Sequence, residues 1–463
     1  GIPMDPIEVA YQEALDYLYT FVDYSLTRNL RNAAVNFNLD RMRQMMSLLG
    51  DPQKTYKTIH VAGTKGKGST SAMIASALQA QGYQVGFYTS PHLEDYIERI
   101  QVNRKPISHS EMTDLVNYMK PFIAQVPEIT TFELTTALGF LYFARKGVEI
   151  AVVEVGLGGR LDATNILDPL VSVITSLSYD HTSVLGDTLA QIAGEKAGII
   201  KTGRDVVLSP QKDEALKVVE KIAKERNAPL TLVGREYCFS ELTHSLKNQT
   251  MAIWPASDQN LADAFIEKRS DEWQPTQLVI PLLGRHQVEN AATAYVTLQI
   301  ARQRGLAITE EAIKKGFASV WWPGRFEILQ ASPFVIVDSA HNRDSALKLR
   351  LALDDYLPGV PVIMVFGASE DKDIQGMFTE LLPRVKKVIA TQSVHPRAMD
   401  PEKLVELAHT FGCTAQAVVP INDALQAAIE QADGKDAILI TGSLFVAAAI
   451  RSTWRELIDH TLA

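Results

Sequence analysis

The sequence has few cysteines and no excess of positive charge. Cys238 and Cys413 are the two cysteines among 463 residues, and they lie far apart without the spacing of metal ligands. A disulfide framework is therefore not expected, and the reducing cytoplasm is the predicted compartment. The formal net charge of -9 at pH 7 argues against a nucleic-acid-binding surface. It still allows a local basic pocket for an anionic substrate.

Long hydrophobic runs are also missing. No stretch approaches the roughly 18 apolar residues of a membrane helix. Asp5 and Glu8 stand where a secretory signal would carry a basic segment, so neither a membrane span nor a signal is expected. Hydrophobic residues at 46% and charged residues at 21% are typical of a globular chain, and the length predicts two or three domains.

Strand-like and helix-like segments alternate along the first two thirds of the chain. Short apolar or β-branched runs predict buried strands, and runs with helical periodicity predict the helices between them. Such alternation is typical of a parallel, doubly wound α/β sheet. The predicted strands are 58–62, 83–89, 148–155, 170–177 and 205–208, and the predicted helices are 71–81, 213–226 and 284–304.

A second α/β series follows the turn 321–325, where Pro323 and Gly324 break the pattern. We therefore predict a large parallel-sheet domain over residues 1–320 and a smaller Rossmann-like domain over residues 321–463. The polar stretch 235–277 is interpreted as a small β-rich insertion. The second series has predicted strands at 334–337, 362–366, 387–391 and 437–441, and predicted helices near 345–356, near 374–382 and from 401 onward.

A glycine-rich loop follows the first predicted strand and opens a helix, which is the context of a phosphate-binding loop. Its glycines let backbone N–H groups approach phosphate oxygens, and Lys67 can reach the β- and γ-phosphates. The first domain is thus predicted to be a P-loop-type ATPase domain. The loop reads Gly63, Thr64, Lys65, Gly66, Lys67, Gly68, Ser69 and Thr70.

The fit to the common P-loop is imperfect. Val61 replaces its first glycine, and Gly68 stands where Ser or Thr usually offers a hydroxyl to magnesium. Ser69 and Thr70 can cap the helix and offer hydroxyls instead. A glycine-rich turn that binds no ligand is the alternative interpretation.

Titratable residues lie at or just after the ends of three predicted strands, at the sheet edge where ligands bind in such folds. Glu154 ends a run that should be buried, where a carboxylate is costly unless it is paired or binds a metal. His181 is a candidate neighbour of magnesium or phosphate. Asp338 and His341, at a strand-to-helix turn, suit ribose or base binding or general-base work.

Each of these residues also has a structural interpretation. Glu154 could be a paired or capping carboxylate, His181 a structural histidine, and Asp338 a helix cap. Lys196 lies in a segment of small apolar residues and could be a solvated helix lysine. Arg325, in the turn between the domains, could reach nucleotide phosphates across the cleft or lie exposed.

Taken together, the motifs resemble those of folylpolyglutamate synthase and bifunctional dihydrofolate synthase, within the Mur ligase superfamily. They cover nearly the whole chain in the family's order. Any one of them would be a weak or moderate signal, whereas the combination is specific. The motifs are residues 63–69, 89–93, 131–135, 154–165, 180–181, 195–201, 286–290, 322–325 and 338–342.

The resemblance implies a role for each matched residue. The glycine loop would hold ATP, with Asn290, Arg325 and Asp338 as nucleotide contacts. Ser90, Glu154 and His181 would bind magnesium, with Ser90 supplying the oxygen that Gly68 lacks. The pterin or folate pocket would include Phe132, Glu133, Arg160, Leu161 and Asp162.

The resemblance also implies the chemistry. Lys67, Lys196 and His341 would be catalytic, with Lys196 carbamylated beside the metal and His341 near the incoming glutamate. ATP would convert a folate or dihydropteroate carboxylate to an acyl phosphate, which the amine of L-glutamate attacks. One departure is that the family usually has Asn where this chain has Lys65. We also expect a monomer that can bind a monovalent cation. No nucleic-acid or membrane partner is expected.

Two other functions stay open at this point. The chain could be another Mur-type ligase that acts on a different carboxylate, such as a peptidoglycan precursor. The folate-type loop and the segment 154–165 argue against it. It could also be a non-catalytic ATP-binding regulator, against which the complete set of implied metal ligands argues.

Overall fold

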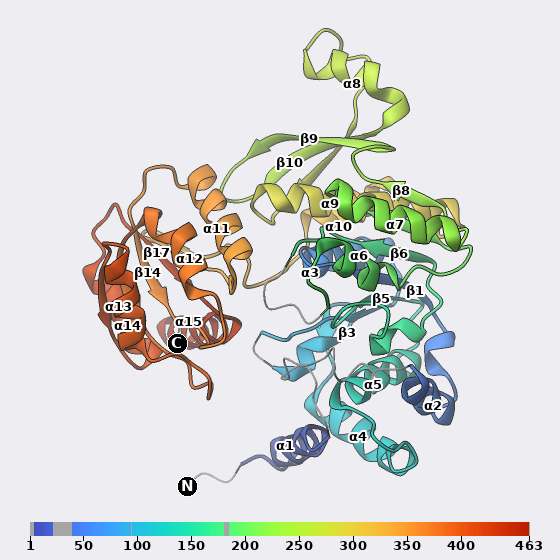
Figure 1. Ribbon diagram of the computed structural model, residues 1–463, viewed down its shortest axis with the longest axis horizontal. Coiled ribbons are helices and arrows are strands. Elements are labelled where there is room, and N and C mark those ends of the chain that lie inside the picture. The colour runs from blue at the N-terminus through green and yellow to red at the C-terminus, as the bar shows by residue number, and fades with distance from the viewer. Residues whose placement is uncertain (1–3, 22–38, 94, 180–184, 463) are drawn as a thin grey trace.

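The computed structural model describes residues 4–21, 39–93, 95–179 and 185–462. These residues form an eight-stranded sheet, a three-stranded sheet and a six-stranded sheet, each with its own helices. Figure 1 shows the six-stranded sheet and its helices, orange to red, as a lobe beside the larger first unit. The predicted α/β class, with a large parallel-sheet unit followed by a smaller Rossmann-like one, is confirmed.

The eight-stranded sheet has the order β4-β3-β2-β5-β1-β6-β7-β8. The strands from β2 to β8 in this order pair in parallel, while β3 and β4 form an antiparallel edge. Central β1, which leads into the glycine loop, lies between β5 and β6. The strands are β1 (Lys57–Ala62), β2 (Val85–Tyr88), β3 (Ile100–Val102), β4 (Lys105–Pro106), β5 (Ile150–Glu154), β6 (Val171–Ile174), β7 (Asp205–Leu208) and β8 (Leu230–Leu232).

Side chains alternate between the two faces of this sheet, as the pleat requires. Ile59 and Val61 pack with α3 (Lys67–Gln81), α9 (Arg285–Gln303) and α10 (Glu310–Ala318) on one face. Residues of opposite parity pack under the other helices. Those helices are α1 (Pro6–Tyr19), α2 (Asp40–Leu48), α4 (His109–Ile123), α5 (Thr131–Arg145), α6 (Leu189–Ala197) and α7 (Asp213–Glu225).

The polar stretch that we interpret as a β-rich insertion forms the three-stranded antiparallel sheet, in the order β11-β10-β9. It lies beyond α9 at the top of Figure 1. Its buried residues Met251, Ile253 and Leu278 join the same core as α9, so the insertion packs on the first unit. Its elements are β9 (Tyr237–His244), β10 (Gln249–Pro255), α8 (Gln259–Ile266) and β11 (Thr276–Ile280).

The six-stranded sheet has the order β12-β13-β17-β14-β15-β16, with β12 antiparallel to β13 and the remaining pairs parallel. Its strands are β12 (Glu327–Ala331), β13 (Phe334–Val337), β14 (Val362–Phe366), β15 (Val385–Ala390), β16 (Thr414–Ala417) and β17 (Ala437–Thr441). Its helices are α11 (Arg343–Tyr356), α12 (Ile374–Leu381), α13 (Pro401–Thr410), α14 (Ile421–Gln431) and α15 (Leu444–Leu462).

The segment between α10 and β12 is fixed at both ends. Arg104, in the β3–β4 turn, donates from Nη2 to the Trp321 carbonyl at 2.7 Å. Beyond it, Gly324 N donates to Glu327 Oε2 at 2.9 Å, and Ser339 N donates to the Gly324 carbonyl at 2.9 Å. Trp321 is thus tied to the first sheet and Gly324 to the second. The domain boundary near residue 320 stays a prediction.

Helices α3 and α10 are packed closely against each other. A Cβ atom at Gly316 would lie 2.4 Å from the Ala77 Cα, which is backbone that cannot move aside independently. The hydroxyl of Ser76 donates to the Gly316 carbonyl at 2.6 Å. Since α3 carries the glycine loop at its start, this contact supports the loop from behind.

Gly316→Ala should therefore destabilise the first unit. The added methyl forces α3 and α10 apart, and overpacking of this kind costs about 1–3 kcal/mol. The measurement is the midpoint of thermal unfolding, which should fall by several degrees. Gly194→Ala in α6 is the matched control, because the nearest atom to its Cβ is Val218 Cγ1 at 4.0 Å. It should be neutral or stabilising by up to about 1 kcal/mol. Equal midpoints for Gly316→Ala and the unmodified protein would contradict the account.

Candidate active site

The glycine loop connects β1 to α3, and two of its glycines are required by the backbone and its neighbours. Gly66, the N-cap of α3, has φ of 85°, in the left-handed region. A Cβ there would lie 2.2 Å from Asn290 Oδ1. A Cβ at Gly63 would lie 1.8 Å from Thr175 Oγ1. At Gly63 and Gly66 the loop therefore lies so close to side chains of the first unit that a Cβ atom does not fit.

Gly68 has a different neighbour, the ring of Trp322 from the segment between the sheets. A Cβ at Gly68 would lie 2.3 Å from Trp322 Cζ2. The Trp322 ring in turn contacts Phe87 edge-on at a centroid distance of 6.1 Å, and the Arg104 guanidinium lies 5.8 Å from its centroid. The missing P-loop hydroxyl thus has a steric reason, because Ser or Thr at position 68 would collide with Trp322.

Two predicted residues meet behind the loop. Lys67 Nζ donates to the Val155 carbonyl at 3.2 Å, beside the buried carboxylate of Glu154. Thr89 donates its hydroxyl to Glu154 Oε2 at 2.7 Å. Burial raises the pKa of Glu154, while the charge of Lys67, the Thr89 hydroxyl and Arg325 act in the opposite direction. Glu154 is therefore a buried carboxylate held next to cations, which is an arrangement for ligand or metal binding.

The oxygen donors here fit magnesium. Glu154 and Ser90 line one cavity together with Ser69, and carboxylate and hydroxyl oxygens with water are ligands that magnesium accepts. Across the described part of the chain, no three His, Cys, Asp or Glu side chains gather as a metal site. The third predicted ligand, His181, lies outside the described residues, as does Asp180.

Lys196 lies behind the loop. It is buried and donates from Nζ to the Gly63 carbonyl at 3.0 Å, so it contacts the loop backbone. Thr70 is also buried, inside the first turn of α3. Carbamylation of Lys196 stays a prediction.

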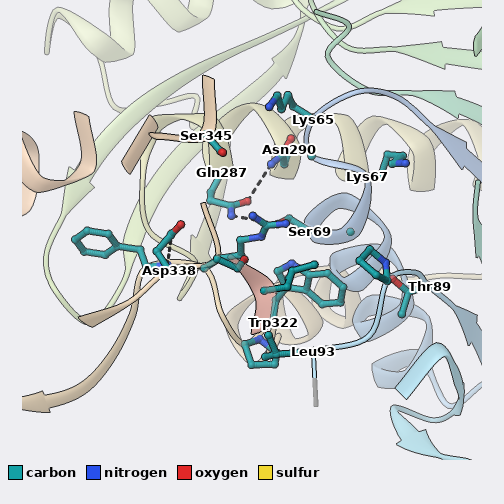
Figure 2. Close-up of a pocket in the computed structure, with 18 of the residues that line it drawn as sticks. Lys65, Lys67, Ser69, Thr89, Leu93, Gln287, Asn290, Trp322, Asp338 and Ser345 are labelled. Atoms are coloured by element: carbon teal, nitrogen blue, oxygen red, sulfur yellow. Dashed lines mark hydrogen bonds between the residues drawn. The ribbon is translucent and has the colours of Figure 1, made fainter. Parts of the chain in front are cut away.

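A hydrogen-bonded chain of side chains links the loop to α9. Gln287 Nε2 donates to Ser69 Oγ at 3.1 Å, and Asn290 Nδ2 donates to Gln287 Oε1 at 3.0 Å. Figure 2 shows this chain beside Lys65 and Lys67. Asn290, predicted as a nucleotide contact, is therefore also fixed against the loop from the other side.

On the second unit, Asp338 follows β13. Its two carboxylate oxygens accept from Phe326 N and Ala340 N, both at 2.8 Å. Burial raises the pKa of Asp338, whereas Arg325 and these two backbone hydrogen bonds lower it. In this arrangement Asp338 holds the turn that carries Arg325 and Phe326.

His341 follows two positions after Ser339, and its Nδ1 lies 3.1 Å from the Ser339 carbonyl. Because a carbonyl oxygen only accepts, Nδ1 carries the proton and Nε2 presents a lone pair. Burial, with the charges of Arg325 and Lys372, lowers the pKa of His341 to about 4. The imidazole is thus neutral near pH 7.

A cavity of 710 Å³ between the two units collects most of the predicted nucleotide, metal and catalytic residues. The close-up in Figure 2 shows residues of both units around it. The sequence-predicted residues that line the cavity are Thr64, Lys65, Gly66, Lys67, Gly68, Ser69, Ser90, Glu154, Asn290, Arg325, Asp338 and His341.

The predicted folate-pocket residues do not line this cavity. Phe132 lies next to a lining residue, because a Cβ at Gly156 would lie 2.2 Å from Phe132 Cζ. Asp162 accepts from Gly156 N at 3.1 Å and Leu157 N at 3.0 Å, and so shapes the same segment. Leu161, beside it, is partly buried.

The two remaining folate-pocket predictions are engaged in ion pairs. Glu133 caps the start of α5 through Thr130 and pairs with Arg41 at 3.0 Å. Arg160 pairs with Glu195 at 3.1 Å, and its side chain is 53% exposed. Their roles toward a substrate stay predictions.

Several cavity residues escaped the sequence analysis. Ser345, Lys348, Leu349 and Ala352 form one face of α11, and their helical spacing alone suggests burial in a core. Arg104 lies in a tight hairpin turn, and its only sequence signal is the short spacing between β3 and β4. No local motif marks Arg451 and Arg455 of α15, which also line the cavity.

Comparison with known families gives two domain matches. Residues 61–298 match the model described as the Mur ligase middle domain. Residues 324–444 match the model described as Mur ligase, glutamate ligase domain. Among the described residues, none of the helices has the length and apolar character needed to cross a membrane.

This chain is similar to curated proteins and to solved structures over nearly its full length. The dihydrofolate synthase/folylpolyglutamate synthase of Bacillus subtilis is 35% identical over 449 residues, covering 96% of this chain and 98% of the relative. The crystal structure of folylpolyglutamate synthase from Thermotoga maritima superposes with a TM-score of 0.82 at 34% identity, covering 97% of both chains.

A third relative was solved with ligands. Escherichia coli FolC in complex with DHPP and ADP superposes with a TM-score of 0.81 at 30% identity, covering 98% of both chains. Both Mur ligase domain models and these full-length relatives agree with the resemblance of the motifs. The chain belongs to the Mur ligase family and, within it, to the folylpolyglutamate and dihydrofolate synthases.

Proposed function

We propose that this chain is an ATP-dependent amide ligase that joins L-glutamate to the carboxylate of a folate, of dihydropteroate, or of both. The observation that carries this proposal is the 710 Å³ cavity, which Lys67 and Glu154 line from the first unit and His341 from the second. A reaction of ATP with an acid and an amine requires that all three reactants are held close together, and a cavity lined by both units can do this. The family assignment supports the same reaction.

The proposed chemistry has two steps. A carboxylate oxygen of the folate or dihydropteroate attacks the γ-phosphorus of ATP, the bond to the bridging oxygen breaks, and ADP leaves. The amine of glutamate then attacks the acyl carbon, and a tetrahedral intermediate collapses with loss of inorganic phosphate and a proton. The protein's contribution to such reactions is positioning and charge stabilisation.

The loop and its surroundings stabilise the phosphate charge. Backbone N–H groups at the start of α3 and the ammonium of Lys67 are suited to the β- and γ-phosphates. Magnesium, when bound, would offset the charge on the transferred phosphate, and Glu154, Ser90 and His181 are the residues proposed to hold it. Lys196 supports the loop through the Gly63 carbonyl.

His341 is suited to orient the amine rather than to take its proton. A general base works best when its pKa lies near the operating pH, and the pKa of His341 is about 4. Its Nε2 lone pair can accept a hydrogen bond from the attacking amine. The Ser339 carbonyl fixes the ring for that task.

Two rival functions are weaker. The relatives' names favour folate and dihydropteroate over a peptidoglycan precursor as the acid. A non-catalytic regulator does not require Lys67, buried Glu154 and His341 at one cavity. Carbamylated Lys196, a monovalent cation and a monomeric state belong to the proposal as implications of the family.

The central test is glutamate incorporation with ATP and magnesium, comparing dihydropteroate with reduced folates and identifying products by mass spectrometry. Lys67→Met and Glu154→Gln should each reduce incorporation about 10²-fold or more, because Lys67 offsets charge on the transferred phosphate and Glu154 is proposed to hold the magnesium that does the same. Lys146→Met is the control, since Lys146 pairs with Glu111 on α4, away from the cavity. Its activity should be unchanged.

Thermal unfolding midpoints decide whether the two site variants are folded. Near-normal incorporation by either folded variant would overturn the assignment. Absence of glutamate-dependent ATP consumption in the unmodified protein, with all the acids offered, would overturn the function itself.

The role of His341 predicts a pH dependence. Since its pKa is lowered to about 4, the required neutral imidazole is present throughout the range above that value and is lost only as the pH falls through it. The kcat/KM for glutamate, measured at saturating ATP and magnesium, should therefore show no acidic limb near the ordinary histidine pKa of about 6.5. A limb near that pH that disappears in His341→Asn would contradict this role.

A further inference from the structure

Lys65 extends from the glycine loop to the second unit. Its backbone N–H donates to the Ser176 carbonyl at 3.1 Å, which fixes it to the first sheet. Its Nζ donates to Asn342 Oδ1 at 3.1 Å and lies 3.3 Å from Asp344 Oδ2. The Lys65 side chain is 16% exposed, so this ion pair is partly shielded from solvent. One side chain thus connects the phosphate loop to the start of α11.

The side chain of Lys65 ends at the capped start of α11. Asn342 is the N-cap of α11, and its Oδ1 also accepts from Ser345 N and Ser345 Oγ, both at 2.8 Å. An ammonium at a helix N-terminus is unfavourable, because the helix dipole is positive there. Asp344, in the first turn, compensates for this repulsion, so Lys65 is placed there by that carboxylate.

The same turn carries the candidate amine site. His341 immediately precedes Asn342, and its backbone N–H donates to Ser345 Oγ at 3.1 Å. Lys65, which contacts this turn from the glycine loop, lies two positions before Lys67 in the sequence. A displacement of the loop that moves Lys65 is therefore transmitted to the turn that fixes His341.

We propose that Lys65 is a positioning residue that clasps the phosphate loop to the first turn of α11, so that loop and amine site are placed together. The clasp rests on the proposed function for its catalytic meaning. If the clasp exists, Lys65 and Asp344 act through their mutual contact. They do not each contribute separately to the adhesion between the two domains.

A second ion pair between the two units offers a control. Arg285 of α9 lies 3.3 Å from Asp355 near the far end of α11, so it also joins the two units at the same distance. Neither Arg285 nor Asp355 lines the cavity. If general adhesion between the units mattered, Asp355→Ala would have the effect of Asp344→Ala.

The test is a double-mutant cycle of Lys65→Met and Asp344→Ala, with Asp355→Ala beside it. Asp344→Ala should raise the KM for glutamate about threefold, the size expected for a partly exposed ion pair. The dissociation constant of a non-hydrolysable ATP analogue should stay unchanged in this variant. In the Lys65→Met background, Asp344→Ala should add no further change to the KM for glutamate, because the pair is already broken. Any further change in that background would measure the effect of Asp344 on Lys348, its neighbour at 3.7 Å, and not the contact with Lys65.

A second measurement does not depend on turnover. Hydrogen exchange of the backbone amides of residues 343–347, recorded with the ATP analogue bound, should be faster in Lys65→Met and Asp344→Ala to the same extent. Asp355→Ala should leave these amides at the wild-type rate.

The outcomes separate the two hypotheses. Additive effects on the KM, equal effects of Asp344→Ala and Asp355→Ala, or unchanged exchange in Lys65→Met would overturn the clasp while glutamate incorporation stands. If the unmodified protein incorporates no glutamate but the exchange pattern is as expected, the proposed function is wrong and the clasp is upheld.

Discussion

The fit of the Trp322 ring against Gly68 is the constraint on which the site depends. No side-chain atom is tolerated at position 68, because a Cβ would lie 2.3 Å from the ring. Trp322, in the segment between the two sheets, thereby forms part of the cavity wall next to the glycine loop. The glycine loop and the segment that leads to the second unit are consequently packed against each other, and the departure of the loop from the common P-loop pattern has a reason in this packing.

Buried strands were the most predictable part of the fold. The predicted ranges for β7, β13, β14 and β17 coincide with the observed ones, because each is a short apolar run flanked by polar or turn residues. Helices α1, α2, α4 and α5 were not predicted. They cover one face of the first sheet, and α5 is buried nearly all round, which hides helical periodicity. The edge strands β4 and β16 are too short or too polar to give a signal.

Much of the candidate site could be located from sequence, because strand ends and glycine loops are local features. Glu154 and the loop are joined by neighbouring strands β5 and β1, so their proximity follows from topology. The contact of Lys65 with Asp344 could not be predicted, since the two lie on different units. The structural partners of Glu133 and Asp162, whose carboxylates accept from backbone N–H groups or pair with Arg41, could not be predicted either, and their roles in a folate pocket stay predictions.

The fastening of the segment between the sheets limits how the two units can move. Trp321 is held through its carbonyl by Arg104 of the first unit, and Gly324 is held by Glu327 and Ser339 of the second. Trp322 and Pro323 stand between these attachments, and the proline ring removes one torsion by fixing its φ. Relative rotation is therefore confined to very few backbone torsions. The segment between the two units therefore acts as one short hinge, and not as a flexible tether between independent units.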